Sequence, residues 1–246
     1  MDREIAKPCG VTQGKVAEDF DGWASSYEKM IDEAVAFSGR KRAFYTDVKL
    51  GHLLRLARQR FADLESLKVL DLGCGTGTFH PGLKDRFGEL HGVDVSARSI
   101  KLAAARHPFA RYSTYDGTRL PYGDGHFSMV FTISVMHHVP PRQWASFVAE
   151  AYRVTASGGL VLVFENNPYN PFTQYFVKTC EIDKDAVLLP PAKLRRMFTA
   201  AGFTDVLTRT ILSVLPSGKS LTRIDSLLGN LPFGAQYYLS ATKNVR

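Results

Sequence analysis

With 246 residues, 45 % of them hydrophobic and 22 % charged, the sequence has the size and composition of one globular α/β domain with added segments. The net charge is +7, but the basic residues are dispersed, which argues against a nucleic-acid partner. No apolar run approaches the ~20 residues of a transmembrane helix, and the polar start MDREIAKPCGVTQG lacks the apolar stretch of a signal peptide. We therefore expect a cytoplasmic protein.

The first 67 residues are mostly helical in pattern, and a sheet follows them. Apolar residues recur every three or four positions in KLGHLLRLARQRFADL, which is typical of a helix face. From there on, strands predicted at 69–72, 89–94, 128–136, 159–164, 204–213 and 236–243 alternate with helices predicted at 96–106, 141–155 and 190–203. This alternation indicates a doubly wound α/β sheet that is parallel for its first five strands, with ligands at the carboxyl ends of those strands.

A glycine loop follows the first predicted strand. Gly73, Gly75 and Gly77 let the backbone turn tightly and approach a ligand. Asp94 closes the next strand, 21 residues after Gly73, where a carboxylate accepts hydrogen bonds from ribose hydroxyls. The two features together indicate a ligand that contains a nucleoside.

Two details of the loop DLGCGTG favour S-adenosylmethionine over a dinucleotide. Thr78 stands where the dinucleotide fingerprint GxGxxG has its third glycine. Asp71, just before the loop, would repel a pyrophosphate but can bind an amino group. A ligand with an α-amino acid and a ribose therefore fits better than NAD.

The segments VLDLGCGTGTF, GVDVS, YDGTRLPYGDGHFSMV and SVMHHV, in this order, resemble the class I S-adenosylmethionine-dependent methyltransferases, in particular the small-molecule group called type 11. The resemblance covers residues 20–202 and implies a Rossmann-like seven-stranded sheet whose last strand is antiparallel. It also implies S-adenosylhomocysteine as the product. One departure concerns packing more than activity: Ser128 stands where the family usually has Asp.

The resemblance implies a set of cofactor-binding residues. They are Asp71, Gly73, Cys74 and Gly75 for the methionine end, Asp94 for the ribose hydroxyls, Val95, Asp116 and Gly117 for the adenine, Ser134 near the sulfur, and Tyr27 closing over the cofactor. No metal is expected, because Cys9, Cys74 and Cys180 are scattered and form no CxxC pattern.

Three residues are candidates for the general base that a hydroxyl acceptor would need. His137 and His138 follow the fourth strand of the implied sheet, and an imidazole titrates near neutral pH. We prefer His137 to His138, with Glu165 at the end of the next strand as the second choice. Packing beneath the loop, without catalysis, is the alternative for the pair.

The run FENNPYNPFTQYF follows the fifth strand and borders the expected acceptor pocket. Asn166 and Asn167 offer donors and acceptors and Tyr169 offers a flat apolar surface, so we predict that they bind the acceptor. The alternative is a turn followed by a helix whose aromatic residues, Phe172, Tyr175 and Phe176, face the core.

We therefore predict a single methyltransferase domain over residues 1–246, with a helical cover at 1–67, a Rossmann-like core at 68–246 and an inserted helix near 217–232. For this insertion we expect packing on the sheet edge, and a contact with a second copy or with a membrane surface are the alternatives. The oligomeric state stays open between a monomer and a homodimer. The expected activity is methylation of a small-molecule acceptor, first at a hydroxyl of a specialised metabolite or a sugar-containing compound. N- or C-methylation, a nucleic-acid methyltransferase and a non-catalytic cofactor-binding module are the alternatives.

Overall fold

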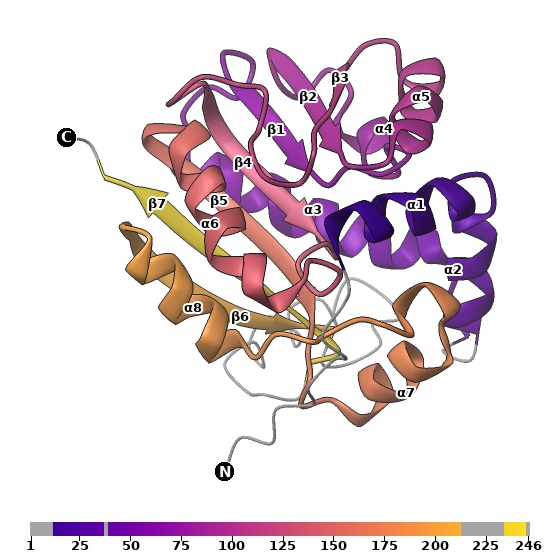
Figure 1. Ribbon diagram of the computed structural model, residues 1–246. Coiled ribbons are helices and arrows are strands. Elements are labelled where there is room, and N and C mark those ends of the chain that lie inside the picture. The colour runs from indigo at the N-terminus through magenta and orange to yellow at the C-terminus, as the bar shows by residue number, and fades with distance from the viewer. Residues whose placement is uncertain (1–11, 37–38, 213–233, 245–246) are drawn as a thin grey trace.

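The computed structural model describes residues 12–36, 39–212 and 234–244. Within them, a sheet runs through the molecule with helices on both sides (Figure 1). The strands are β1 (Lys68–Leu72), β2 (Glu89–Asp94), β3 (Arg111–Thr114), β4 (Phe127–Ile133), β5 (Thr155–Asn166), β6 (Phe203–Ile211) and β7 (Gln236–Lys243). The α-helices are α1 (Gln13–Trp23), α2 (Tyr27–Val35), α3 (Arg42–Arg60), α4 (His80–Leu83), α5 (Ala97–Arg106), α6 (Trp144–Val154), α7 (Pro171–Thr179) and α8 (Pro191–Ala200), with short 3-10 helices η2 (Pro141–Gln143) and η3 (Glu181–Asp183).

The sheet has seven strands in the order β3-β2-β1-β4-β5-β7-β6. Strands β1 to β5 pair in parallel, and β7 runs antiparallel to both of its neighbours, β5 and β6. The doubly wound sheet with an antiparallel last strand is therefore confirmed. Because β1 lies between β2 and β4, the strand order reverses there, and such a reversal opens a crevice at the carboxyl ends of the strands.

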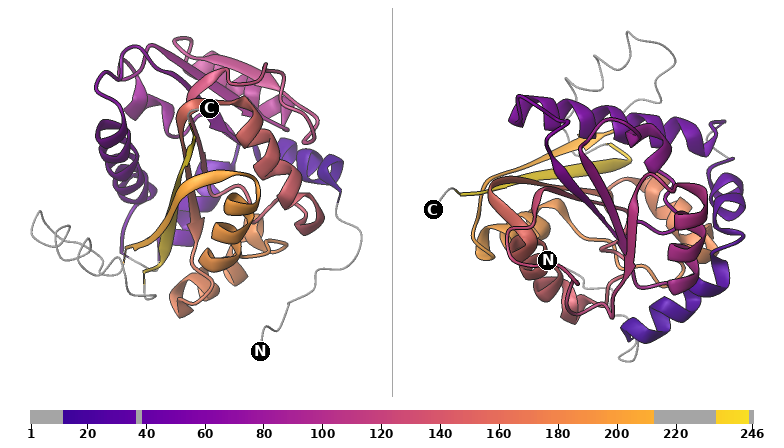
Figure 2. Two further views of the ribbon diagram at one scale, coloured as in Figure 1. Left: turned by 90° about the vertical axis from the view of Figure 1, so that its left-hand side faces the viewer. Right: turned by 90° about the horizontal axis from the view of Figure 1, so that it is seen from above.

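Helices cover both faces of the sheet, as a parallel sheet requires. One core cluster joins the strands to α6 and α8 through Trp144 and Phe198, and the other joins them to α3 through Leu53 and Ala57. Figures 1 and 2 show α6 and α8 on one side of the sheet and α3 on the other. The central strands read as continuous apolar runs because both of their faces are buried.

Two features differ from the expectation. Strand β4 ends at Ile133 rather than at Met136, because Ser134 has a positive φ of 58° that turns the chain out of the sheet. Strand β3 has only exposed and half-buried residues, so the residue pattern did not predict a strand there. A strand between β2 and β4 was implied only by the resemblance.

The helix of the alternative interpretation is present after β5, but the aromatic core face of that interpretation is not. In α7 the buried side chains are Thr173 and Val177, whereas Phe172 is 69 % exposed and Tyr175 57 % exposed. The helix begins with a proline at its first position, and Asn170 caps it: Asn170 Oδ1 accepts a hydrogen bond from Thr173 N at 3.0 Å. Spacing alone found the helix but not its buried side.

Helices α1, α2 and α3 precede β1, as expected for the N-terminal cover. That the whole chain forms one domain stays a prediction, and the insertion predicted near 217–232 lies outside the described residues. Among the described residues, no helix combines the length and the apolar character needed to cross a membrane.

Candidate functional site

A cavity of about 730 Å³ lies at the carboxyl ends of β1, β2, β4 and β5. Its volume is in the range of small-molecule sites. Side chains of α1, α2, α3 and α7 complete its walls, and Figure 1 shows α1, α2 and α7 gathered at this end of the sheet. Of the predicted cofactor-binding residues, those that line the cavity are Tyr27, Asp71, Gly73, Cys74, Gly75, Asp94, Val95 and Ser134.

The glycine loop is fixed to β2 by its own backbone. Gly73 N and Cys74 N donate to Val93 O at 2.8 and 3.1 Å, and Gly75 N donates to Asp94 Oδ2 at 2.8 Å. Gly73 has a φ of 83°, and a Cβ at this position would lie 2.5 Å from Val135 Cγ2. Glycine is therefore required at Gly73 both by its conformation and by the close approach of Val135 in the turn after β4.

Asp94 connects the loop to the next helix. Its Oδ1 accepts from Ser96 N at 2.9 Å, and its side chain is 8 % exposed. Burial raises the pKa of Asp94 to about 6, against the opposing effect of the Ser96 and Gly75 amides, and the nearby Asp71 also raises it. In the cavity, hydrogen bonds from ribose hydroxyls would replace some of the hydrogen bonds to water that the buried carboxylate has lost.

Binding of S-adenosylhomocysteine is expected to weaken as the pH falls below about 6. Ribose hydroxyls donate to the ionised carboxylate of Asp94, and that form is present above the pKa of about 6 and lost below it. The affinity for S-adenosylhomocysteine should therefore be highest at pH 7 to 8. Below the pKa it should decrease with a slope that approaches about tenfold per pH unit. Calorimetric titration between about pH 5 and pH 8 measures this, and the profile of Asp94→Asn should be flatter.

Asp71 is the second buried carboxylate of the cavity. It is 2 % exposed, and its Oδ2 lies 3.1 Å from His80 Nε2, whose ring is held in turn by Tyr112 through a 2.5 Å contact between Nδ1 and the hydroxyl. Burial raises the pKa of Asp71, and its contact with His80 opposes that rise. Two buried carboxylates favour a cationic ligand and disfavour a pyrophosphate.

Asp116 and Gly117 lie outside the walls of this cavity. Asp116 is exposed, and its Oδ1 accepts from Thr118 N and Oγ1 at 2.8 and 2.6 Å and from Arg119 N at 3.2 Å. Gln13 of α1 packs against Gly117 so closely that a Cβ there would lie 2.0 Å from Gln13 Cγ. The contact of Asp116 with adenine stays a prediction, and Tyr115 lines the cavity beside it.

The three candidate bases belong to one buried network. Glu165 Oε1 accepts from Val135 N and Met136 N at 3.1 and 2.8 Å, and Oε2 lies 2.5 Å from His137 Nδ1. On its other side, His137 Nε2 lies 3.5 Å from Asp183 Oδ1, which is 3.3 Å from His138 Nε2. Asp183 was not predicted from the sequence. It lies 45 residues after His138 and outside the motifs quoted above, so only the fold brings it to the histidines.

The network favours positioning over proton removal for two of the candidates. Burial lowers the pKa of His137, but Glu165 and Asp183 outweigh it and raise that pKa to about 10. Carboxylates therefore face both ring nitrogens of His137, the residue that we preferred as the base. Glu165 is 1 % exposed and does not line the cavity.

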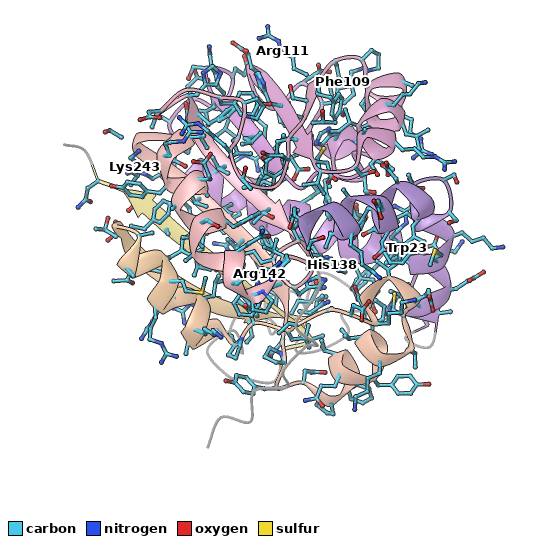
Figure 3. The ribbon with its side chains drawn as sticks, in the orientation of Figure 1. Trp23, Phe109, Arg111, His138, Arg142 and Lys243 are labelled. Atoms are coloured by element: carbon cyan, nitrogen blue, oxygen red, sulfur yellow. The ribbon has the colours of Figure 1, made fainter. Side chains whose placement is uncertain are left out.

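His138, whose pKa is lowered by burial and by His137, lines the cavity and packs edge-on against Phe20 of α1 at 5.0 Å between ring centroids. Figure 3 shows His138 inside the molecule, where β4 ends beside α1.

The asparagines after β5 separate into two roles. Asn166 lines the cavity, and its Oδ1 accepts from Gln236 Nε2 at 3.0 Å. Asn167 is fully buried away from the cavity, where its Nδ2 donates to Gly234 O at 2.7 Å and its Oδ1 accepts from Tyr169 N at 3.1 Å. Asn167 therefore stabilises the loop, while Asn166 and Tyr169 remain on the cavity wall.

Lys49 of α3 lines the cavity as well and was missed by the sequence analysis. It is 7 % exposed, and its Nζ lies 5.7 Å from the centre of the Phe79 ring. Burial lowers its pKa to about 8, although Glu165 and Asp183 raise it. The only signal in the sequence was one lysine at an apolar position of the helix pattern, which also fits a solvated edge of a helix face.

Comparison with known proteins finds similarity to methyltransferases over part of the chain. Residues 69–159 match the family described as a methyltransferase domain. A demethylmenaquinone methyltransferase of Streptomyces griseus is 29 % identical over 67 % of this chain and 68 % of that protein. Tocopherol O-methyltransferase of Arabidopsis thaliana is 36 % identical over 39 % of this chain and 29 % of that protein. The chain spans about half, 49 %, of an uncharacterized methyltransferase of Synechocystis that is 34 % identical.

Solved structures share the fold at lower identity. A S-adenosylmethionine-dependent methyltransferase of Thermotoga maritima, described as a possible histamine N-methyltransferase, superposes with a TM-score of 0.66 at 19 % identity, covering 93 % of this chain and 99 % of that one. The [4+2]-cyclase SpnF superposes with a TM-score of 0.67 at 18 % identity, covering 96 % and 98 %. The fold alone therefore does not specify methyl transfer.

The sheet order, the glycine loop and the two buried carboxylates define a nucleoside-binding protein of the Rossmann-like type. Together with the domain matched over residues 69–159 and the relatives named as methyltransferases, these features support a class I S-adenosylmethionine-dependent methyltransferase.

Proposed function

We propose that the protein transfers a methyl group from S-adenosylmethionine to a small molecule, first of all to a hydroxyl. The observation that carries the proposal is one continuous cavity lined by two unlike sets of groups. Asp71, the glycine loop and Asp94 make up the first set, which we call the cofactor half, and Lys49, Asn166, Phe172 and Phe176 make up the second, the acceptor half. A cofactor and an acceptor need such a common space for an in-line transfer.

The cofactor half suits the chemistry of a sulfonium. Bound S-adenosylmethionine supplies the electrophilic methyl group, so that the protein has to bind, orient and exclude water. Asp94 would accept from the ribose hydroxyls, and Asp71 would accept from the amino group of the methionine end. Both carboxylates are already held by hydrogen bonds from the loop or by His80, so little reorganisation is needed on binding.

The acceptor half combines flat apolar surface with a few polar groups. Tyr169, Phe172 and Phe176 supply the apolar wall, and Lys49 and Asn166 supply a cation and an amide. This combination fits a hydroxylated ring with an apolar portion. Relatives named for demethylmenaquinone, tocopherol and 2-methyl-6-phytyl-1,4-hydroquinone support the same class of acceptor. A sugar-containing acceptor, or methylation at nitrogen or carbon, is the alternative.

A screen for S-adenosylhomocysteine formation tests the proposal. The full chain is incubated with S-adenosylmethionine and four acceptor sets: hydroxylated rings with apolar tails, glycosides, small amines and an oligonucleotide. Product with the first set supports the proposal, and product confined to the amines or the oligonucleotide would overturn it. Cofactor binding without product from any set would favour a non-catalytic module or another reaction on this fold.

Lys49→Met is expected to lower kcat/KM for a hydroxylated acceptor roughly 10- to 100-fold, because a charged hydrogen bond contributes about 1.5–3 kcal/mol. The Kd of S-adenosylhomocysteine should change little, since the Lys49 ammonium lies over the Phe79 ring and takes no part in the hydrogen bonds that hold Asp71, the glycine loop and Asp94. The variant should also unfold at a higher denaturant concentration, because it relieves the burial of an ammonium group. Steady-state kinetics with calorimetry and urea unfolding separate these effects; a loss confined to cofactor binding would contradict this role of Lys49.

A further inference from the structure

Two imidazoles and one carboxylate converge on the wall of the cavity. His137 and His138 come from the turn after β4, and Asp183 is the last residue of η3. One ring nitrogen of each histidine and one oxygen of Asp183 all lie within 4.8 Å of one another. All three residues line the cavity. A histidine pair with one carboxylate is a common ligand set for divalent transition metals.

Two separations within this triad match those between ligands of one ion. Asp183 Oδ1 lies 3.5 Å from His137 Nε2 and 3.3 Å from His138 Nε2. Charge-assisted hydrogen bonds between such groups are usually ~2.7–2.9 Å long. Neighbouring ligand atoms around a tetrahedral ion with bonds of ~2.0–2.2 Å are separated by ~3.3–3.6 Å.

The surroundings of the triad fix its orientation. Glu165 Oε2 lies 2.5 Å from His137 Nδ1, and the other oxygen of Glu165 accepts from the Val135 and Met136 amides. Histidine ligands of metals almost always donate their second nitrogen to such a carboxylate. On the other side, the edge-to-face contact with Phe20 holds the ring of His138. The Nε2 atoms of both histidines are thereby directed at the same carboxylate oxygen.

We propose that His137, His138 and Asp183 bind a divalent transition-metal ion, with Zn²⁺ as the reference ion, and that its remaining coordination position faces the cavity. Three protein ligands with one open position are typical of reactive rather than structural metal sites. The open position would take an oxygen of the acceptor, a role that rests on the function proposed above, whereas metal binding itself does not depend on it. The cysteine spacing that led us to expect no metal gave no information on this triad.

Metal binding by the full chain tests the proposal. Protein stripped with a chelator is titrated with Zn²⁺ by calorimetry and with Co²⁺ by visible absorption, whose intensity reports low coordination number. We expect one equivalent of either ion per chain, a loss of at least roughly 100-fold in affinity for Asp183→Asn and His138→Ala, and a loss of about 10- to 100-fold for Glu165→Gln. His126→Ala, at an exposed histidine outside the cavity, is the control and should bind as the parent does.

Titration of each metal-free variant with S-adenosylhomocysteine shows whether it is folded and keeps the two proposals apart. If the parent protein still binds S-adenosylhomocysteine but shows no one-to-one binding of either ion by calorimetry or absorption, the metal site is overturned and the proposed function stays intact. Binding that persists unchanged in Asp183→Asn and His138→Ala would overturn it too. Loss of nucleoside binding with an intact metal site would instead count against the proposed function. Should His138→Ala unfold, His138→Gln, which keeps the volume, takes its place.

Discussion

Asp94→Ala is expected to raise the Kd of S-adenosylhomocysteine by roughly 100-fold or more. Two hydrogen bonds from ribose hydroxyls to an ionised carboxylate contribute about 3 kcal/mol or more together, and 1.4 kcal/mol corresponds to tenfold. The substitution also removes the acceptors of Gly75 N and Ser96 N, so that the glycine loop loses its link to the end of β2. Calorimetric titration of parent and variant measures the change.

Asp116→Ala provides the matched comparison, because its carboxylate follows β3 at the same end of the sheet but lies outside the cavity. The geometry predicts a small change in Kd for this variant, whereas the family resemblance predicts a loss through the adenine amino group. An equal loss in both variants would favour the resemblance over the structure at Asp116. A parent-like Kd for Asp94→Ala would remove Asp94 from the site.

Glu165→Ala is expected to lower the free energy of unfolding by about 3–5 kcal/mol, as removal of one partner from a buried ion pair does. Its carboxylate is 1 % exposed and serves three donors: the Val135 amide, the Met136 amide and His137. With alanine, all three donors lose this acceptor in the interior. The Val135 and Met136 amides find no partner in the sheet, because the chain has already left β4 at these residues. Urea unfolding of the metal-free protein gives the difference.

Glu181→Ala is the control for this prediction, because its carboxylate belongs to an exposed pair with Lys184. Little change in unfolding is expected there, as for other exposed ion pairs. If Glu165→Ala unfolded like Glu181→Ala and instead lost only kcat, then Glu165 would act as a catalytic residue, which was our second choice from the sequence.

The cofactor half of the site was predictable because its chemistry is local in the sequence. Gly73, Gly75 and Asp94 sit at the ends of two consecutive strands, and parallel strands bring such ends together. The positive φ of Gly73 and the closeness of Val135 then account for the glycine. The same locality explains why the doubly wound parallel sheet followed from the alternation of strands and helices.

The acceptor half was less predictable because its residues meet only in the folded chain. Lys49 comes from a helix before the sheet and Asp183 from a short helix after β5, so no spacing connects them to His137. The exposed side of α7 was also not predicted, since Phe172 and Tyr175 have the spacing of a core face but are exposed to solvent. Burial depends on what packs against a helix, which a single segment does not encode.

The most direct test of the account is a calorimetric titration of the parent protein with S-adenosylmethionine, with NADH as the competing nucleoside ligand. We predict a single site that binds S-adenosylmethionine at micromolar concentration and no heat with NADH, because two buried carboxylates favour a cationic ligand over a pyrophosphate. No heat with S-adenosylmethionine at high micromolar concentration, or tighter binding of NADH, would contradict it.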